Sequence, residues 1–334
     1  MNRPATDFLK IESLMMNGVV FRTIMECLKI KLFDDFEEHF FSSGEYAKKR
    51  GFKEQPTTAM LELLTANGLL IKTAEGYTNS RLSSEHMITN APHYQGSLLK
   101  INCHFNESIS SNLLTTLKGA NDSRENCDES WAMEESIKGS AAHARLGALQ
   151  DTTEFIYSLP EFPQMRTMCD IGGCHGEFTM ALLDKNPTLS GEITDFPEVC
   201  EVAAKHIPLH KYQDRITLIP RDLRSEQLSK KHYDLIIASH VLYAFMDKLD
   251  EILNMIHNAL NSGGWFVTQH MDKNGSLPPD YANTLEFITR MSGYDTHFID
   301  TAELIAKLEK AGFHCPPPAS AGYNGIGAIV AGQK

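Results

Sequence analysis

The strongest constraint on the fold is a regular alternation of apolar runs and amphipathic segments in the second half of the chain. Five apolar runs have the length of β-strands, and they cover residues 165–171, 190–194, 215–219, 234–239 and 264–270. Segments with helical periodicity separate them. Strands that alternate with helices predict a mostly parallel sheet with helices on both faces. We therefore expect a doubly wound α/β domain in this part of the chain.

The first half has a different pattern. Apolar residues recur at helical spacing over residues 11–41, and a second helix is indicated at Thr57 to Ala66, before Asn67-Gly68. Two short β-like runs at residues 69–71 and 76–78 follow around a polar turn. Helix, helix and hairpin in this order are typical of a winged-helix domain.

We accordingly predict three parts of the chain. They are a winged-helix domain over residues 1–100, connecting helices over residues 101–160, and an α/β domain over residues 161–334. A winged helix can bind DNA or can pair subunits and cover a substrate. The candidate recognition helix, PTTAMLELLTANG, has no Arg or Lys, which are the residues that contact phosphates and bases. The net charge of −12 also disfavours a nucleic-acid partner. A ligand-sensing transcription regulator remains the alternative from another class of protein.

The remaining bulk features predict a cytoplasmic protein. The first residues, MNRPATDFLKIESLMM, lack the pattern of a signal peptide, and no run of apolar residues is long enough to cross a membrane. The seven cysteines are scattered, which indicates reduced thiols, and no set of residues has metal-ligand spacing. We expect no metal and no membrane partner.

A glycine-rich turn follows the first predicted strand, at DIGGCHG, residues 170–176. Glycines let the backbone turn sharply and approach a ligand closely. Asp195 ends the next strand, where a carboxylate can accept hydrogen bonds from ribose hydroxyls, and Asp222 ends the third, where it can accept from an adenine amino group. The G-G-x-x-G spacing differs from that of dinucleotide sites. The carboxylates of Asp170, Asp195 and Asp222 would also repel a pyrophosphate. An NAD-dependent oxidoreductase is therefore the weaker interpretation.

The segments DIGGCHG, TDFPEV, RDL, SHVLY and NSGGW together resemble the successive motifs of the class I O-methyltransferases that use S-adenosylmethionine. This family includes plant caffeic acid and animal hydroxyindole O-methyltransferases. The resemblance implies a Rossmann-like catalytic domain and an N-terminal winged-helix dimerisation domain. It also implies a homodimer, S-adenosylmethionine as cofactor, S-adenosylhomocysteine as product and a small-molecule methyl acceptor.

The resemblance implies cofactor-binding residues as well. Gly172, Gly173 and Gly176 would line the methionine part of the cofactor. Asp195 would hold the ribose, and Asp222 with Leu223 the adenine. We expect four further residues to complete the site: Asp170, Phe196, Ser239 and Met133.

The chain departs from the family at the general base. Where the family reads S-H-V-L-H-D-W, this chain has Ser239-His240-Val241-Leu242-Tyr243-Ala244-Phe245, so that Tyr243 occupies the base position. A tyrosine with an ordinary pKa near 10 is a poor base at neutral pH. We therefore keep Tyr243, His270 and His297 as catalytic candidates, the two histidines as relocated bases.

A missing base points to acceptors that carry no proton. A thioether sulfur is one, and the family includes S-methyltransferases of methylthio-hydroxy acids, such as 4-methylthio-2-hydroxybutyrate, on the route to dimethylsulfoniopropionate. We favour such an acid as the acceptor. The alternatives are a hydroxyl oxygen with a relocated base, a carbon acceptor, and a cofactor user that transfers no methyl group. An arginine fork suits a carboxylate, so Arg145 and Arg290 are candidates for binding the acid. Trp131 and His143 are the other substrate-binding candidates.

Overall fold

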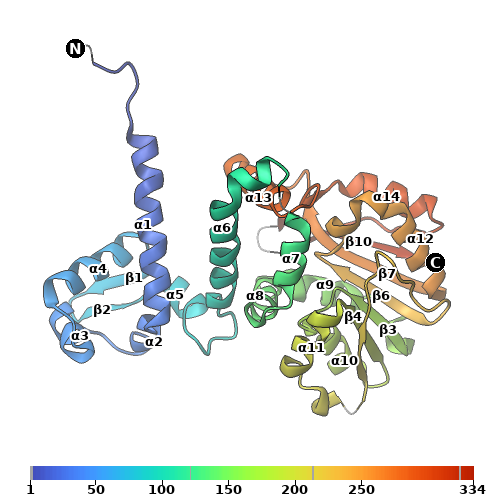
Figure 1. Ribbon diagram of the computed structural model, residues 1–334. Coiled ribbons are helices and arrows are strands. Elements are labelled where there is room, and N and C mark those ends of the chain that lie inside the picture. Colours follow the sequence, from blue (N-terminus) through green and yellow to red (C-terminus); the bar gives the residue numbers. More distant parts are fainter. Residues whose placement is uncertain (1–2, 121, 213, 323–324) are drawn as a thin grey trace. The chain divides into compact units, whose positions relative to one another are not determined.

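The computed structural model describes residues 3–120, 122–212, 214–322 and 325–334. They fall into two units, Met1–Lys100 and Ile101–Lys334 (Figure 1).

The N-terminal unit has the helices and the hairpin that the winged-helix prediction requires. Its elements are α1 (Leu9–Lys29), α2 (Leu32–Asp35), α3 (Ser43–Arg50), α4 (Glu54–Ala66), β1 (Leu70–Thr73), β2 (Gly76–Asn79) and α5 (Arg81–His86). The start of α3 is set by a capping box, because the side chain of Ser42 accepts from the backbone N–H of Glu45 and the Glu45 carboxylate accepts from the N–H of Ser42.

The predicted helical segment over residues 11–41 is wrong in its extent. The helix ends at Lys29, and Lys31 has a φ of 53°, in the left-handed region, which interrupts the helical path. Apolar residues continue beyond this point because Leu32, Phe33 and Phe36 are fully buried in the core of the unit. The hydrophobic pattern reports their burial, whatever the backbone conformation.

The second unit alternates helices and strands. A long helix, α6 (Gly96–Leu117), leads into it. The other helices are α7 (Ser123–Trp131), α8 (Glu134–Ala144), α9 (Ala148–Tyr157), α10 (Glu177–Lys185), α11 (Pro197–His206), α12 (Leu249–Ala259), α13 (Pro279–Met291) and α14 (Thr301–Lys310), with 3-10 turns at Phe162–Gln164, Leu209–Tyr212 and Leu242–Lys248. The strands are β3 (Thr167–Ile171), β4 (Ser190–Asp195), β5 (Ile216–Pro220), β6 (Tyr233–Ser239), β7 (Leu260–Asp272), β8 (Phe298–Ile299), β9 (Ala319–Ala321) and β10 (Gly327–Gln333).

The sheet has the order β5-β4-β3-β6-β7-β10-β9, with β8 paired to β7. The five predicted strands are parallel to one another, which confirms the doubly wound α/β prediction. The antiparallel strands β9 and β10 were not predicted. From β3 the chain proceeds through β4 and β5 on one side and then returns to β6 and β7 on the other. Ligands of such sheets bind at the carboxyl ends of the strands where the order reverses, here between β3 and β6.

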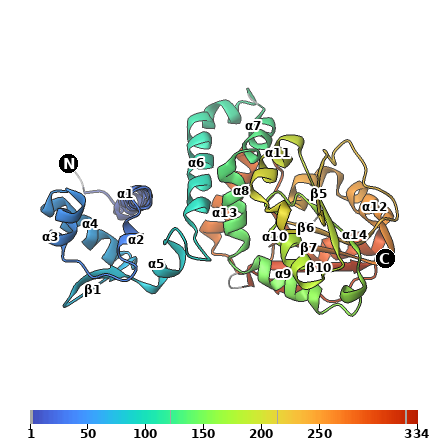
Figure 2. The same ribbon diagram turned by 90° about the horizontal axis from the view of Figure 1, so that it is seen from below.

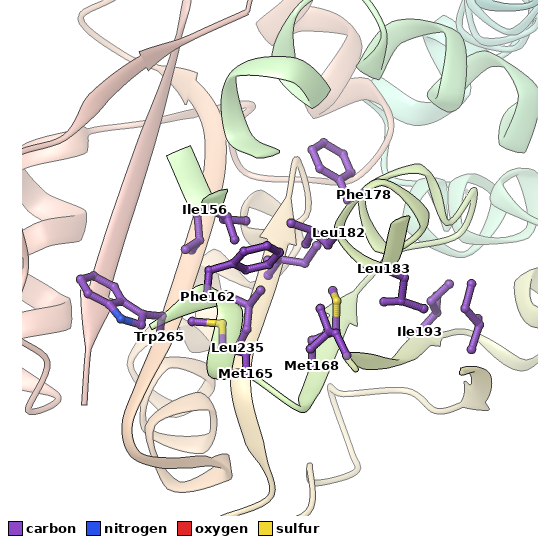
Figure 3. Packing of buried hydrophobic residues seen from close by; sticks show 14 of the residues in the cluster. Ile156, Phe162, Met165, Met168, Phe178, Leu182, Leu183, Ile193, Leu235 and Trp265 are labelled. Atoms are coloured by element: carbon purple, nitrogen blue, oxygen red, sulfur yellow. The ribbon is translucent and has the colours of Figure 1, made fainter. Parts of the chain in front are cut away.

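Strand β6 shows why the apolar runs are continuous. Leu235 and Ile237 belong to one hydrophobic cluster, and Tyr233, Ile236 and Ala238 belong to another. Alternate side chains point to opposite faces of a strand, so β6 is buried on both faces. Figure 2 shows α9, α10 and α11 on one side of the sheet and α12 and α14 on the other. Figure 3 shows the first cluster, with its side chains gathered on one face.

The described residues form neither a membrane-spanning helix nor a cluster of metal ligands. No helix among them has the length and apolar character that a membrane crossing requires. They also contain no group of three or more His, Cys, Asp or Glu side chains arranged to hold a metal ion.

Asp234 connects three strands at the start of the sheet. One carboxylate oxygen accepts from the backbone N–H groups of Arg166 (2.7 Å) and Thr167 (3.2 Å), and the other accepts from the amide of Asn261 (2.8 Å). We predict that Asp234→Ala lowers the free energy of unfolding by about 2–3 kcal/mol, because three donors lose a charged acceptor. Urea denaturation followed by Trp fluorescence measures the loss. Asp247→Ala, at an exposed position, serves as the control, and equal effects of the two substitutions would contradict the prediction.

Candidate cofactor and acceptor site

The glycine-rich turn lies at the carboxyl end of β3 and leads into α10. Gly172 has a φ of 65°, and a Cβ atom there would lie 2.7 Å from a methyl group of Val241. A Cβ atom on Gly173 would lie 2.5 Å from the carboxyl carbon of Asp170. Gly176 forms the N-cap of α10. The turn therefore keeps its close approach to β3 and to the segment after β6 only with glycine at these positions.

The carboxylate of Asp195, at the end of β4, holds this turn from the neighbouring strand. Oδ2 accepts from the backbone N–H of Cys174 (3.2 Å) and Oδ1 from that of Phe196 (2.8 Å). Burial raises the pKa of Asp195 to about 6. Asp195 thus lies at the carboxyl edge of the sheet, beside the turn, with lone pairs that the two backbone donors do not use.

Asp170 lies behind the turn. Its side chain is 1% exposed and accepts a hydrogen bond from the Thr179 hydroxyl (2.8 Å). Burial raises its pKa to about 7, with a smaller contribution from the charge of Asp195. Its contacts fix the turn to α10, and a direct contact of Asp170 with the cofactor stays a prediction.

The carboxylate of Asp222, at the end of the third strand, already accepts hydrogen bonds from an arginine. Arg224 donates to both of its oxygens, from Nε (2.9 and 3.1 Å) and from Nη2 (2.9 Å). The guanidinium of Arg224 also lies 4.7 Å from the centre of the Phe196 ring. The neighbouring Leu223 is 7% exposed. The expected adenine contacts are therefore close to one another, with an arginine among them that sequence reasoning missed.

The residues at these strand ends fit S-adenosylmethionine by the chemistry of their donor set. Carboxylates suit the ribose hydroxyls and a sulfonium cation, whereas they repel a pyrophosphate. Ser239, at the end of β6, donates from its hydroxyl to Gln269 (3.1 Å), and Met133 precedes α8 as its N-cap and is partly buried. No described contact connects Met133 to the glycine turn, so its contribution stays a prediction.

Tyr243 lies in a group of aromatic rings. It is stacked on His297, with ring centres 5.1 Å apart and 29° between the planes, and it meets Tyr294 edge to face at 5.3 Å. Burial raises the pKa of the Tyr243 hydroxyl above its ordinary value, so that the ring stays a neutral phenol at neutral pH. Tyr243 is therefore unsuited to act as a base in this environment.

His297 is the candidate base in contact with that ring. Its Nδ1 hydrogen-bonds with the Thr289 hydroxyl (3.2 Å), and its backbone N–H donates to Glu286 (3.0 Å). Within the described ranges, Nε2 makes no hydrogen bond. Burial lowers the pKa of His297 to about 4, so the imidazole is neutral at pH 7, and the charge of Glu286 acts in the opposite direction.

His270 has a different environment, inside the sheet. It is 3% exposed, and its Nε2 lies 3.2 Å from the Thr301 hydroxyl. Its Nδ1 is buried and has no hydrogen-bond partner among the described residues. Burial also lowers its pKa to about 4. No ring contact joins His270 to Tyr243 in the described structure.

The two arginines expected to bind an acid are both paired with glutamates. Arg145 forms an ion pair with Glu177, and Arg290 forms one with Glu286 at 2.8 Å, one helical turn away. A guanidinium already bound to a carboxylate offers fewer donors to a substrate acid. The structure therefore favours no carboxylate-binding role for either residue.

The other acceptor candidates lie on the helices that precede the sheet. His143, on α8, has its ring 5.4 Å from that of His240, and the His240 ring lies 6.2 Å from that of His297. Trp131 ends α7 and packs against Phe105 with ring centres 5.6 Å apart. A small cavity between α6, α7 and α13 is lined by Phe105, Cys127 and Met291, among others.

Sequence reasoning missed three residues that the structure brings together, namely Asp128, Arg224 and Tyr294. Asp128 forms an ion pair with Arg224 (2.6 Å) and accepts from the Tyr294 hydroxyl (2.8 Å). No motif or spacing marks these residues, because the partners are far apart in the chain.

Comparison with known proteins finds methyltransferases among the relatives of this chain. Residues 148–313 match a family model described as an O-methyltransferase domain. The chain is 24% identical over 273 residues to 3-hydroxy-5-methyl-1-naphthoate 3-O-methyltransferase of Streptomyces sahachiroi, which covers 78% of this chain and 77% of that protein. It is 22% identical to rat (Rattus norvegicus) acetylserotonin O-methyltransferase, over 77% of this chain and 62% of that protein.

Solved structures show the same fold. An O-methyltransferase family protein from Burkholderia thailandensis superposes with a TM-score of 0.75 at 19% identity, over 99% of both chains. Human N-acetylserotonin methyltransferase, solved with S-adenosylmethionine, superposes with a TM-score of 0.69 at 18% identity, over 100% of this chain and 99% of that one.

The sheet, the glycine turn and the strand-end carboxylates define a Rossmann-like methyltransferase that depends on S-adenosylmethionine. The match of residues 148–313 to the family model makes this part of the chain similar to the O-methyltransferase domain.

The raised pKa of Asp195 predicts a pH dependence of cofactor binding. If Asp195 holds the ribose, as expected, the ribose hydroxyls donate to the ionised carboxylate, so binding lowers the pKa of Asp195 and weakens when the carboxylate is protonated first. We expect the Kd for S-adenosylhomocysteine to be constant above about pH 7 and to rise by up to about tenfold per pH unit below pH 6. Isothermal titration calorimetry measures it. Asp195→Asn should bind about 10–100 times more weakly at pH 8 and lose the pH dependence. A dependence that persists in this variant would contradict the assignment.

Proposed function

We propose that this enzyme transfers the methyl group of S-adenosylmethionine to a hydroxyl oxygen of a small molecule, with His297 as the proton acceptor. The observation that carries the proposal is the stacking of His297 on Tyr243, the residue at the family's base position. The thioether acid that the sequence favoured has less support. Both arginines considered for its carboxylate are paired with glutamates, and the matching family model describes an O-methyltransferase domain.

The cofactor-binding part of the proposal uses the strand ends. Asp195 would accept from the ribose hydroxyls, Asp222 and Leu223 with Phe196 would contact the adenine, and the turn at Gly172, Gly173 and Gly176 would let the methionine part approach the backbone. Asp170 and Ser239 support this edge of the sheet through their contacts with Thr179 and Gln269. When bound, S-adenosylmethionine supplies an electrophilic methyl group on a sulfonium cation.

The residues around His297 are suited to take a proton. Its imidazole is neutral at pH 7, and Thr289 orients the ring through Nδ1, which leaves Nε2 as the basic nitrogen. Nε2 would take the proton of the acceptor hydroxyl as that oxygen receives the methyl group, which would leave S-adenosylhomocysteine as a neutral thioether. The imidazole of His297 would then carry the positive charge, and Glu286 favours the charged imidazole from nearby.

Tyr243 then serves as a wall of the acceptor pocket. Its ring holds the imidazole in place from one side, and Tyr294 packs against its edge. Because transfer between aligned atoms depends strongly on geometry, a rigid aromatic wall helps to align the acceptor with the methyl group. His143, His240 and Trp131 are proposed to complete the pocket.

We predict that His297→Gln lowers kcat by about 10²–10⁴-fold toward hydroxyl acceptors, the usual contribution of a general base. Tyr243→Phe should change kcat by less than about tenfold, because the stacking is kept. Tyr243→His in the His297→Gln background should restore part of the rate by returning a base to the family's position. Formation of S-adenosylhomocysteine with a panel of phenols, alcohols and thioether acids measures these rates.

The outcomes separate the hypotheses. His270→Gln is the matched control for the loss of a buried histidine. A wild-type rate with His297→Gln, or a preference for thioether acids that no histidine substitution affects, would contradict His297 as the base. Since burial lowers the pKa of His297 to about 4, the acid limb of the wild-type kcat profile, measured at saturating S-adenosylmethionine, should lie below pH 5.

We also propose that the enzyme is a homodimer that pairs through α1. Along one face of this helix Phe8, Ile11, Met15 and Val19 are 55–61% exposed, and they recur at helical spacing. A contiguous apolar face of this kind is typical of an interaction surface. A second copy of the chain covers it in this proposal, as the family resemblance implies.

We predict that Met15→Glu with Val19→Glu makes the protein monomeric, because burying two carboxylates in an apolar interface is strongly unfavourable. Size-exclusion chromatography with light scattering measures the mass. Lys10→Glu, which changes charge on the same helix without touching the apolar face, should leave a dimer. A wild-type mass of one chain, 37.4 kDa, would refute the proposal.

A further inference from the structure

Asp128 joins two parts of the site that are distant in sequence. Its side chain, 17% exposed, lies on α7, and Oδ2 accepts from Nη1 of Arg224 while Oδ1 accepts from the hydroxyl of Tyr294. Both carboxylate oxygens are thus used, each toward a different segment. Asp128, Arg224 and Tyr294 are called the Asp128 clasp below.

One end of the Asp128 clasp lies at the cofactor edge. Arg224 binds both oxygens of Asp222 and covers the ring of Phe196, whose backbone N–H donates to Asp195. An adenine amino group that reaches Asp222 has to share or replace one of these hydrogen bonds with Arg224. The other charged partner of Arg224 is Asp128. A change in the hydrogen bonds between Asp222 and Arg224 therefore also affects the ion pair between Arg224 and Asp128.

The other end of the clasp lies at the acceptor edge. Tyr294 meets the ring of Tyr243 edge to face, and Tyr243 is stacked on His297. Arg124, one helical turn before Asp128 on α7, reinforces this end. Its guanidinium lies 5.2 Å from the centre of the Tyr294 ring and donates to the carbonyl of Ala244, next to Tyr243. A displacement of α7 therefore moves the wall on which the base rests.

We propose that Asp128 is a positioning residue that couples the two halves of the site, so that cofactor binding orders the wall formed by Tyr294, Tyr243 and His297. The inference rests on the proposed function, because it takes the strand ends as the cofactor site. Coupling of this kind is reciprocal, and an acceptor that orders the wall strengthens cofactor binding by the same factor, commonly about 5–150-fold. The charge of Asp128 is the link, because among the described residues its carboxylate is the group that hydrogen-bonds with both Arg224 and Tyr294.

The test uses the full-length protein and S-adenosylhomocysteine as the probe. Calorimetry gives the affinity, and amide hydrogen exchange reports order in the glycine turn, residues 172–177, and in the wall segment, residues 292–299. In the wild type, the probe should slow exchange in both segments. In Asp128→Asn, the Kd should change by less than about fivefold and the turn should still be protected, while the protection of residues 292–299 is lost.

Three further variants make the result specific. Tyr294→Phe keeps the ring and removes only the hydroxyl that Asp128 accepts from, so it should lose the wall protection in the same way. Asp128→Glu keeps the charge and should recover part of the protection of residues 292–299. Glu129→Gln, at an exposed position beside Asp128 on the same helix, is the matched control and should behave as the wild type.

The outcomes distinguish this inference from the proposed function. Wild-type protein that does not bind S-adenosylhomocysteine would overturn the cofactor site and the coupling with it. Normal binding with full protection of residues 292–299 in Asp128→Asn and Tyr294→Phe would overturn the coupling alone.

Discussion

The site depends on a carboxylate at the end of one strand that holds the backbone turn at the end of its neighbour. Asp195 accepts from the N–H groups of Cys174 and Phe196, and so connects the glycine turn after β3 to the start of α11. A buried carboxylate is costly unless backbone donors satisfy it. The donors here leave lone pairs toward the carboxyl edge of the sheet, where parallel α/β domains bind their ligands. One interaction thereby shapes the turn and leaves a carboxylate at the edge where we propose that the ribose binds.

The acceptor half of the site is organised by ring packing around Tyr243. Replacing a basic residue by a phenol at this position removes the proton acceptor that the family pattern has there. The same phenol provides a flat surface on which the imidazole of His297 is stacked. Burial keeps both groups neutral, by raising the pKa of Tyr243 and lowering that of His297. A base can move to another element of the fold because proton transfer requires only proximity and a suitable pKa.

Helix α7 connects the cofactor half and the acceptor half of the site, although neither the glycine turn nor the segment around Tyr243 predicts this connection. Its acidic and basic residues, Asp128 and Arg124, contact the segments after β5, after β6 and after α13. These contacts are charged or aromatic and partly buried, so they are stronger than exposed ion pairs and specific in direction. A short helix can therefore transmit a change at the cofactor edge to the acceptor wall.

Sequence alone determined the α/β class, the five parallel strands and the position of the glycine turn, because local periodicity and glycine spacing report burial and backbone conformation directly. It also placed Asp195 and Asp222 at strand ends. Only the tertiary structure decided that β10 runs antiparallel beside β7, since strand direction depends on how the chain returns after α14. It also decided that Arg224 hydrogen-bonds with the carboxylate of Asp222 and that the ring of His297 is stacked on that of Tyr243. Such contacts join residues far apart in the chain, and their distances are set by the packing of whole elements and not by any local pattern.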